Sequence, residues 1–363
     1  MTALRAARIL TGEGGASASP AWLVMGDGRI VATGSGPAPA GAVDLGDALL
    51  APGFVDIQVN GTGAVDFASA AVDDIVAAID RLVTGGCTGC LPTICSAPLD
   101  AYAGMLDRLG AVRAARPDVV LGVHLEGPFL GDAPGAHPTE LLRTVDLDWL
   151  LACCDRFGDL IALVTLAPEA DPGLRGTAAL SERGVVVALG HSTVDFDGAR
   201  AAADAGATLA THLFNGMGPL HHRAPGLPGA ALTYRPLVPS IIPDGVHVHP
   251  AILKLALGAR PDAVLVTDAV ATTAPVTERD GAAYMPDGTL AGSVLTMLDA
   301  VQHVVALDVP VATAVRHATG NPAAVLGATD RGRLAPGARA DVVVLDPETL
   351  ALRGVWVGGE ATG

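Results

Sequence analysis

The sequence has a single lysine, Lys254, among its 363 residues. A reaction that needs a Schiff-base or carbamylated lysine must therefore use Lys254 or is excluded. Basic residues are scarce in general, because Lys and Arg number 22 against 38 Asp and Glu, which gives a formal net charge of −16. A surface this acidic repels phosphate backbones, so we expect no nucleic-acid partner.

Long apolar runs are also missing. No stretch approaches the roughly 18 consecutive uncharged apolar residues of a membrane span. The segment Met1–Leu10 carries two arginines and no apolar run of signal-peptide length. We therefore expect a cytoplasmic protein with no membrane association.

Cysteines are few, and an odd number does not favour a disulfide framework. Cys87 and Cys90 have the spacing of a redox or zinc motif, but their surroundings are apolar and strand-like, with no second pair of this spacing. We interpret Cys87 and Cys90 as buried structural thiols. The cysteines are Cys87, Cys90, Cys95, Cys153 and Cys154.

Half of the residues are apolar and 17% are charged, which is typical of a globular protein. Between Pro52 and Thr267, short apolar runs typical of strands alternate with Ala- and Leu-rich stretches of helical periodicity. Eight such runs predict an α/β fold of the (β/α)8 TIM-barrel type. The Gly-, Pro- and His-rich sixth connection, residues 215–234, is typical of a shaped loop. The runs are 54–59, 87–94, 119–125, 161–166, 185–189, 208–213, 238–242 and 264–267.

The two ends of the chain are rich in β-like pieces and poor in helical pattern. Neither end alone has enough predicted strands for a stable sheet, so we expect them to pair into one small β-sandwich domain. The predicted domains are 1–51 together with 332–363 for the β domain, and 52–331 for the barrel.

Polar residues follow several predicted strands, at the end of a barrel where active sites lie. Glu126, His191 and His212 would offer one carboxylate oxygen and two imidazole nitrogens, which suits one divalent metal ion, above all Zn²⁺, with a fourth position open to water. Such an ion lowers the pKa of its bound water to about 7 and makes that water the nucleophile for amide hydrolysis. Asp268, after the last strand, could accept the proton and return it to the departing amine.

Eight motifs spread over the whole predicted barrel resemble those of the N-acetylglucosamine-6-phosphate deacetylases, a family of the amidohydrolase superfamily. The motifs are Pro52–Gly61, His124–Phe129, Gly190–Ser192, Thr211–Asn215, Pro225–Leu227, Asp244–His247, Val266–Asp268 and Leu290–Met297.

The resemblance implies hydrolysis of N-acetylglucosamine 6-phosphate to glucosamine 6-phosphate and acetate in amino-sugar catabolism. Glu126, His191 and His212 would hold the metal and Asp268 would be the general base and acid. His247 would polarise the acetyl carbonyl. The substrate-binding residues implied are His137 for the sugar, Arg223 and Asn215 for the phosphate, and also Gly216, Gln58 and Asn60. In relatives the equivalent arginine faces a neighbouring subunit's site, which implies a homodimer.

Two departures from the family pattern leave details open. Gln58 and Asn60 stand where binuclear relatives place His-x-His, and amides are poor zinc ligands, so we expect a single metal ion. The loop from Gly131 to His137 has no lysine where family members often carry them. The substrate could therefore be N-acetylgalactosamine 6-phosphate or another N-acyl amine. The residues also leave open a deaminase of the same superfamily and a barrel kept only for binding.

Overall fold

The computed structural model describes residues 1–13, 15 and 20–362. The chain divides into two compact units. One unit comprises Met1–Asp56, Ile79–Gly89 and the chain from Thr296 onward, and the other comprises Ile57–Ala78 and Cys90–Leu295. The domain boundaries expected from the sequence remain a prediction.

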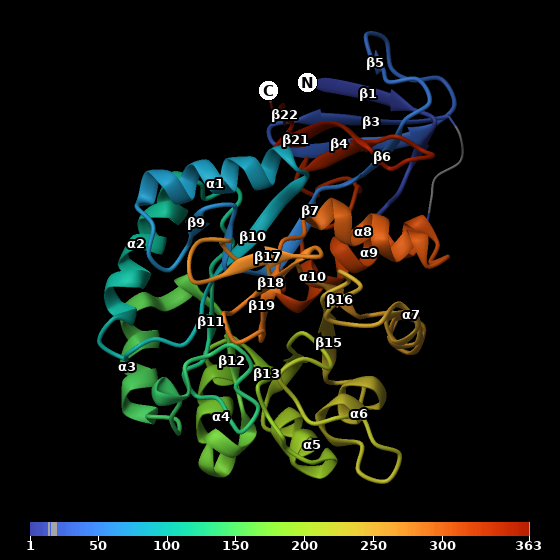
Figure 1. Cartoon of the computed structure of the whole chain (residues 1–363). Helices are drawn as coiled ribbons and strands as arrows, with labels where there is room; N and C mark the ends of the chain where they lie inside the picture. Colours follow the sequence, from blue (N-terminus) through green and yellow to red (C-terminus); the bar gives the residue numbers. More distant parts are fainter. Residues whose placement is uncertain (14, 16–19, 363) are drawn as a thin grey trace. The chain divides into compact units, whose positions relative to one another are not determined.

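The main sheet is a parallel, eight-stranded barrel, which confirms the predicted fold class (Figure 1). Its strands pair in chain order, and a parallel bridge between Val59 and Ala269 joins the first strand to the segment after the last. These strands are buried on both faces, which explains their nearly continuous apolar sequences. They are β7 (Phe54–Val59), β10 (Cys87–Ile94), β11 (Val123–Glu126), β12 (Ile161–Leu166), β13 (Val186–Leu189), β14 (Ala207–Ala210), β15 (Val238–Ile241) and β16 (Val264–Leu265).

Helices follow the barrel strands, and one of them was not expected. The segment predicted as a shaped loop, residues 215–234, contains a helix from Gly226 to Thr233. Pro228 is tolerated because it lies in the first turn, where no backbone N–H is needed, and Leu227 and Ala230 are buried. The helices are α1 (Val72–Thr84), α2 (Tyr102–Ala115), α3 (Leu147–Phe157), α4 (Arg175–Glu182), α5 (Phe196–Asp204), α6 (Gly226–Thr233), α7 (Pro250–Ala259), α8 (Met297–Ala306), α9 (Val311–Ala318) and α10 (Gly320–Val325).

The first unit contains two further sheets (Figure 1). One has the order β4-β3-β1-β5 and comes from the N-terminal residues alone, so the expectation that neither end makes a sheet by itself was wrong. The other combines both ends, because β20 pairs with β6 and β21. A shared core that includes Leu4, Leu23 and Val342 covers both sheets. The strands are β1 (Thr2–Ala6), β2 (Arg8–Ile9), β3 (Ala21–Gly26), β4 (Arg29–Ser35), β5 (Val43–Asp44), β6 (Leu49–Pro52), β20 (Val342–Leu345), β21 (Leu352–Val357) and β22 (Glu360–Ala361).

The second unit also contains two small β elements. An antiparallel sheet follows β16 and consists of β17 (Thr277–Arg279), β18 (Ala282–Tyr284) and β19 (Leu290–Ser293). A short hairpin, β8 (Gly61–Thr62) and β9 (Val65–Asp66), follows β7. Neither element was expected from the sequence.

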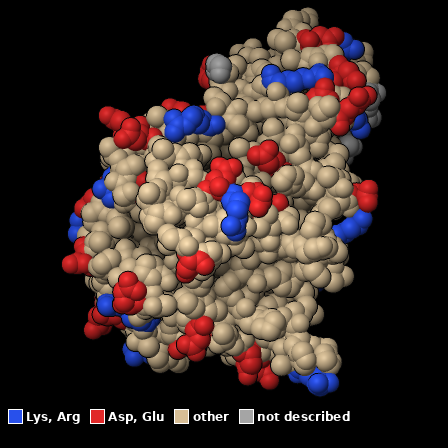
Figure 2. Space-filling view, in the orientation of Figure 1, with Lys and Arg blue, Asp and Glu red and all other residues tan. Residues whose placement is uncertain are grey.

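On the face shown in Figure 2, charged side chains of both signs are scattered singly or in small groups between wide uncharged areas. Within the described ranges, every helix is too short or too polar to cross a membrane.

Candidate active site

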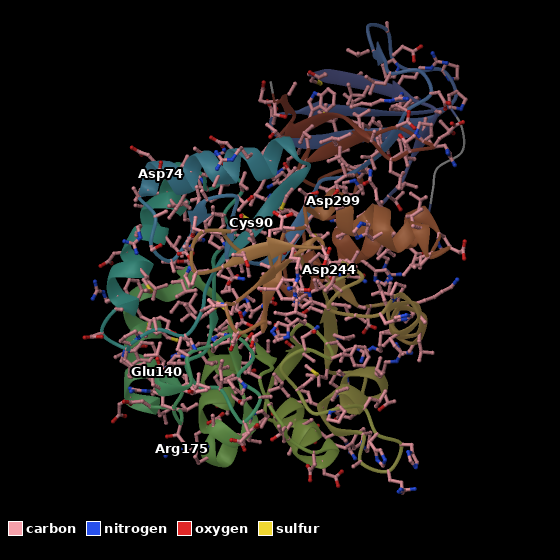
Figure 3. All side chains as sticks on the ribbon, in the orientation of Figure 1. Asp74, Cys90, Glu140, Arg175, Asp244 and Asp299 are labelled. Carbon is pink, nitrogen blue, oxygen red and sulfur yellow. The ribbon has the colours of Figure 1, made fainter. Side chains whose placement is uncertain are left out.

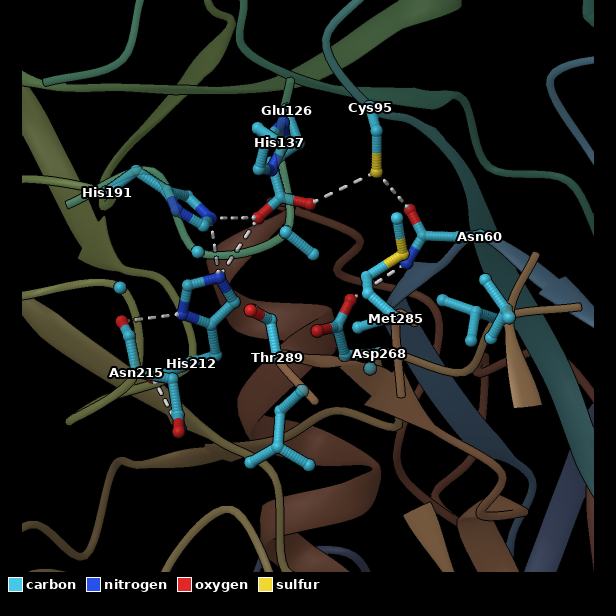
Figure 4. A pocket seen from close by; sticks show the side chains of 18 of the residues that line it. Asn60, Cys95, Glu126, His137, His191, His212, Asn215, Asp268, Met285 and Thr289 are labelled. Atoms are coloured by element: carbon cyan, nitrogen blue, oxygen red, sulfur yellow. Dashed lines mark hydrogen bonds and ion pairs between the residues drawn. The ribbon is translucent and has the colours of Figure 1, made fainter. Parts of the chain in front are cut away.

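A cavity of about 340 Å³ opens where the barrel strands end, and most of the predicted site residues line it (Figure 4). Each of these side chains stands at the end of a strand or in the loop that follows it, which is the functional end of this architecture. The lining residues relevant to chemistry are Asn60, Cys95, Glu126, His137, His191, His212, Asn215, Gly216, His247 and Asp268.

Three donor atoms converge at the bottom of this cavity. Glu126 Oε1 lies 3.2 Å from His191 Nε2 and 3.0 Å from His212 Nε2, and the two Nε2 atoms are 3.1 Å apart. The Nδ1 atoms of His191 and His212 each contact a backbone carbonyl oxygen, that of Ala133 and that of Asn215, both at 3.1 Å. A carbonyl only accepts, so both Nδ1 atoms carry protons. The three buried side chains therefore fit a metal ion, because their remaining lone pairs meet at one point.

The charges of Glu126 and His212 influence each other strongly at this point. Burial acts to raise the pKa of Glu126, but hydrogen bonds and charges from His191 and His212 outweigh it and hold the pKa well below its usual range. Burial acts to lower the pKa of His212, but Glu126 raises it overall. A cation bound here competes with protons for these ligands, so we expect metal affinity to rise with pH.

The backbone at these positions is unusual and tightly packed. His191, His212 and Asp268 all have positive φ angles, of 49°, 29° and 47°. Such conformations cost about 1–3 kcal/mol each and cluster at functional sites. A Cβ atom added to Gly216 would lie 2.7 Å from His191 Nδ1, so this glycine makes room for the His191 ring.

Asp268 is half-buried and lines the same cavity as the three donors. Its Oδ1 atom accepts a hydrogen bond from Asn60 Nδ2 at 2.8 Å. Burial and the charge of Glu126 raise the pKa of Asp268 to about 7, although His212 and His247 act in the opposite direction. A carboxyl group with this pKa can both accept and release a proton near neutral pH.

His247 forms a pair with Asp244, which follows β15 and is labelled in Figure 3. His247 Nδ1 lies 2.5 Å from Asp244 Oδ2, and both side chains are at least 96% buried. Asp244 Oδ1 also accepts the backbone N–H groups of Val246 and His247. Burial acts to raise the pKa of Asp244, but His247 outweighs it and lowers the pKa. The role of Asp244 as the partner of His247 was not predicted from the sequence, although both residues lie in the motif Asp244–His247.

The predicted substrate-binding residues divide into two groups. His137, Asn60, Asn215 and Gly216 line the cavity. His137 Nδ1 lies 2.8 Å from Ser96 Oγ, and burial, followed by the charge of His191, lowers the pKa of His137 to about 3, so the ring stays neutral.

Gln58 and Arg223 are not among the residues that line the cavity. Gln58 is buried behind Glu126 and donates from Nε2 to Glu126 Oε1 at 3.1 Å, while its own Oε1 accepts from Thr211. It supports the Glu126 side chain instead of lining the cavity. Arg223 lies on an exposed loop.

Two parts of the cavity wall were not expected from the sequence. Cys95 faces the cavity, and burial together with the charge of Glu126 raises the pKa of its thiol. The sheet β17–β19 and its flanks supply an apolar wall, which includes Val276, Met285 and Leu290. The motif Leu290–Met297 covers part of this wall, but its strands are short and rich in turn residues, so the sequence did not mark them as a sheet.

Comparisons with known proteins agree with this geometry. Residues 49–362 match the model of the Amidohydrolase family. The chain is 38% identical over 345 residues to N-acetylglucosamine-6-phosphate deacetylase of Bos taurus, covering 87% of this chain and 84% of the relative. It is 36% identical to N-acetylgalactosamine-6-phosphate deacetylase of Escherichia coli O157:H7, covering 98% of both. A solved mutant of the Mycobacterium smegmatis N-acetyl-D-glucosamine-6-phosphate deacetylase, in complex with N-acetyl-D-glucosamine-6-phosphate, has a TM-score of 0.92 and 36% identity, covering 99% of this chain and 98% of that one.

Proposed function

The chain belongs to the amidohydrolase family and, within it, to the N-acetylglucosamine-6-phosphate deacetylases, and from this membership we propose that it hydrolyses N-acetylglucosamine 6-phosphate to glucosamine 6-phosphate and acetate. The observation that carries the proposal is the convergence of Glu126 Oε1, His191 Nε2 and His212 Nε2 in a cavity that also holds Asp268 and His247.

The proposed metal ligands are Glu126, His191 and His212. One carboxylate and two imidazoles suit Zn²⁺, so we propose one zinc ion at this position. A bound zinc ion supplies a Lewis acid and an activated water for amide hydrolysis. The chain contributes the fixed orientation of the ligands, through the carbonyl oxygens of Ala133 and Asn215 and the Gln58 amide.

Asp268 is the proposed general base and acid. Its carboxylate accepts a proton from the attacking water and then releases it to the nitrogen of the departing amine. A pKa raised to about 7 suits both halves of this task. Asn60 fixes the carboxylate by donating to Oδ1, which leaves Oδ2 for the proton.

His247 is proposed to stabilise charge on the acetyl oxygen. Its Nδ1–H donates to the buried carboxylate of Asp244, which fixes the ring, and we propose that Nε2 also carries a proton during the reaction. The Nε2–H group can then donate to the carbonyl oxygen as negative charge develops there. Because Asp244 presets the ring, this interaction costs little reorganisation when the bond to water forms.

The remaining contacts would hold the sugar and its phosphate. We propose that His137 binds the sugar and that Asn215 and Gly216 bind the phosphate. Arg223 is exposed and lies outside the cavity lining of its own chain, so we propose that it reaches the phosphate in a neighbouring subunit's site.

A homodimer is therefore part of the proposal. Large exposed apolar side chains occur on this unit between residues 220 and 255, which fits an interface near Arg223: Leu220, Val246, Ile252 and Leu255. Sedimentation velocity should show a dimer, and Leu255→Asp should weaken it. A wild-type protein that is monomeric at the concentration used in the activity assay would contradict the proposed homodimer.

A cytoplasmic location also remains a proposal. All five cysteines are free thiols, which fits a reducing compartment. Fractionation of cells that express the protein from its own promoter would test the location, and recovery outside the cytoplasmic fraction would contradict it.

The second candidate substrate is N-acetylgalactosamine 6-phosphate. It is favoured by the relative of that name, which matches over 98% of both chains. Acetate release should be measured from both sugar phosphates, with ammonia followed in parallel. Acetate without ammonia supports a deacetylase, and the higher kcat/KM identifies the sugar. Ammonia without acetate would point to a deaminase and overturn the proposal.

A further inference from the structure

Glu169 contacts the turn that follows His191, one of the three proposed metal ligands. It lies in the short turn Pro168–Ala170 after β12, and β12 pairs with β13, the strand that leads to His191 (Figure 1). Glu169 Oε2 accepts the hydroxyl hydrogen of Ser192 at 2.6 Å, and Oε1 accepts the backbone N–H of Thr193 at 2.8 Å. One carboxylate therefore binds the two residues directly after His191.

This turn depends on such contacts, because its backbone is strained. His191 has a φ angle of 49°, a conformation that persists only where the surrounding structure imposes it. The backbone N–H of Ser192 donates to the carbonyl oxygen of Gly216 at 3.0 Å, and the buried Ser192 Oγ accepts the N–H of Val194 at 3.1 Å. The loops after β12 and β14 thus hold the turn from two sides.

Glu169 also supports the loop that orients the His191 ring. Gly131 packs directly on the carboxylate, since a Cβ atom at this position would lie 2.1 Å from Glu169 Oε1. The Gly131 N–H donates to the carbonyl oxygen of His191 at 2.8 Å, and the carbonyl oxygen of Ala133 lies 3.1 Å from His191 Nδ1. Glu169 therefore contacts both segments that fix His191, the turn after β13 and the loop that begins at Gly131.

Glu169 is not among the residues that line the catalytic cavity. It is exposed and lines instead a second cavity of about 560 Å³, together with Gly131 and Asp132. From this place it acts on the reaction through His191 and not by contact with substrate.

We propose that Glu169 is a positioning residue for the metal ion, which keeps His191 Nε2 at the point where it meets Glu126 Oε1 and His212 Nε2. This inference rests on the proposed function, because it takes these three atoms as the ligands of Zn²⁺. Loss of a residue that orients a metal ligand typically lowers metal affinity about 10- to 100-fold. We therefore expect a loss in this range when the Glu169 carboxylate is removed.

The test is competition between metal-depleted protein and a chromogenic chelator for Zn²⁺, which measures metal affinity without an assay of activity. Glu169→Ala should bind Zn²⁺ at least about 10-fold more weakly than the wild type. Glu169→Gln should lose less, because its Oε1 atom can still accept the Thr193 N–H while its amide group donates to Ser192 Oγ. Glu182→Ala, which removes an exposed carboxylate at the end of α4, is the matched control and should bind as the wild type does.

A second readout separates positioning from a general loss of stability. Each variant is compared at a temperature at which circular dichroism shows the metal-depleted protein to be folded. Turnover of Glu169→Ala should then need a higher free Zn²⁺ concentration and recover in excess Zn²⁺, with KM for the sugar phosphate unchanged. A residue that only stabilised the fold would lower the melting temperature and leave the Zn²⁺ affinity of the folded protein unchanged.

A Zn²⁺ affinity of Glu169→Ala within about twofold of the wild type would overturn the proposal. Equal losses in Glu169→Ala and Glu169→Gln would also overturn it, because they would assign the effect to charge and not to the contacts. Should Glu169→Ala fold poorly, Ser192→Ala removes one of the same two hydrogen bonds and should weaken Zn²⁺ binding by less; unchanged binding there would count against the proposal.

Failure of the proposed function is a separate result. Wild-type protein that binds Zn²⁺ and releases no acetate would overturn the function only, because the comparison of metal affinities would still decide the role of Glu169. Wild-type protein that binds no Zn²⁺ would overturn both.

Discussion

The pair formed by Asp244 and His247 offers a sharp test of the proposed charge stabilisation. In Asp244→Asn, Oδ1 can still accept the backbone N–H groups of Val246 and His247. The Oδ2 atom, 2.5 Å from His247 Nδ1, becomes an NH₂ group. This group can only donate, so the ring loses the carboxylate oxygen that accepts its Nδ1–H.

The expected loss follows from the kind of bond that is removed. A hydrogen bond to a charged group contributes about 1.5–3 kcal/mol. If this interaction is made mainly in the transition state, kcat should fall about 10- to 100-fold with little change in KM. Metal content should stay unchanged, because Asp244 contacts neither His191 nor His212 in the structure.

Steady-state acetate release measures this effect, and Asp74→Asn is the matched control. Asp74 undergoes the same chemical change at an exposed position in the first turn of α1. Substitutions at such surface positions usually change stability by no more than about 0.5 kcal/mol. A kcat in Asp244→Asn within about twofold of wild type would refute the role of the pair, and a rise in KM alone would place His247 in ground-state binding instead.

Three further changes probe other parts of the site. Gly216→Ala should lower metal affinity, measured by competition with a chelator, because its Cβ would lie 2.7 Å from His191 Nδ1; unchanged affinity would contradict the packing argument. Asp268→Asn should abolish turnover and keep the metal. Since burial raises the pKa of Asp268 to about 7, this substitution should also raise the melting temperature of metal-depleted protein at pH 8, where the wild-type carboxylate is charged, and less so at pH 5, where it is protonated. A lower melting temperature at pH 8 would argue against a costly buried charge. Arg223→Ala should raise KM for the phosphorylated sugar far more than for the unphosphorylated one, and equal effects would argue against phosphate recognition.

The barrel was predictable because its strands are buried on both faces. The predicted runs at 54–59, 87–94 and 161–166 match β7, β10 and β12 residue for residue. Continuous apolar stretches between turn residues are a strong local signal. The convergence of Glu126, His191 and His212 follows from the same topology, since parallel strands bring their carboxyl ends to one edge.

The missed features lack such a signal. The sheet β17–β19 has short strands in a segment rich in Gly and Asp, so neither periodicity nor length marks it. Helix α6 is short and surrounded by Gly and Pro, which suggested a loop. Cys95 was not distinguished from the buried thiols, because only the fold shows which side of its strand end faces the cavity. Arg223 lies outside the cavity lining of its own chain, and its place in a neighbouring subunit's site, which the resemblance implies, stays a prediction.

The measurement that tests the central claim most directly is acetate release from N-acetylglucosamine 6-phosphate by purified protein, before and after chelation, with metal content determined on the same samples. The account predicts that the untreated protein releases acetate, that chelation abolishes the release, and that Zn²⁺ up to one equivalent per chain restores it. Full acetate release from protein without metal, or bound metal without acetate release from either sugar phosphate, would contradict it.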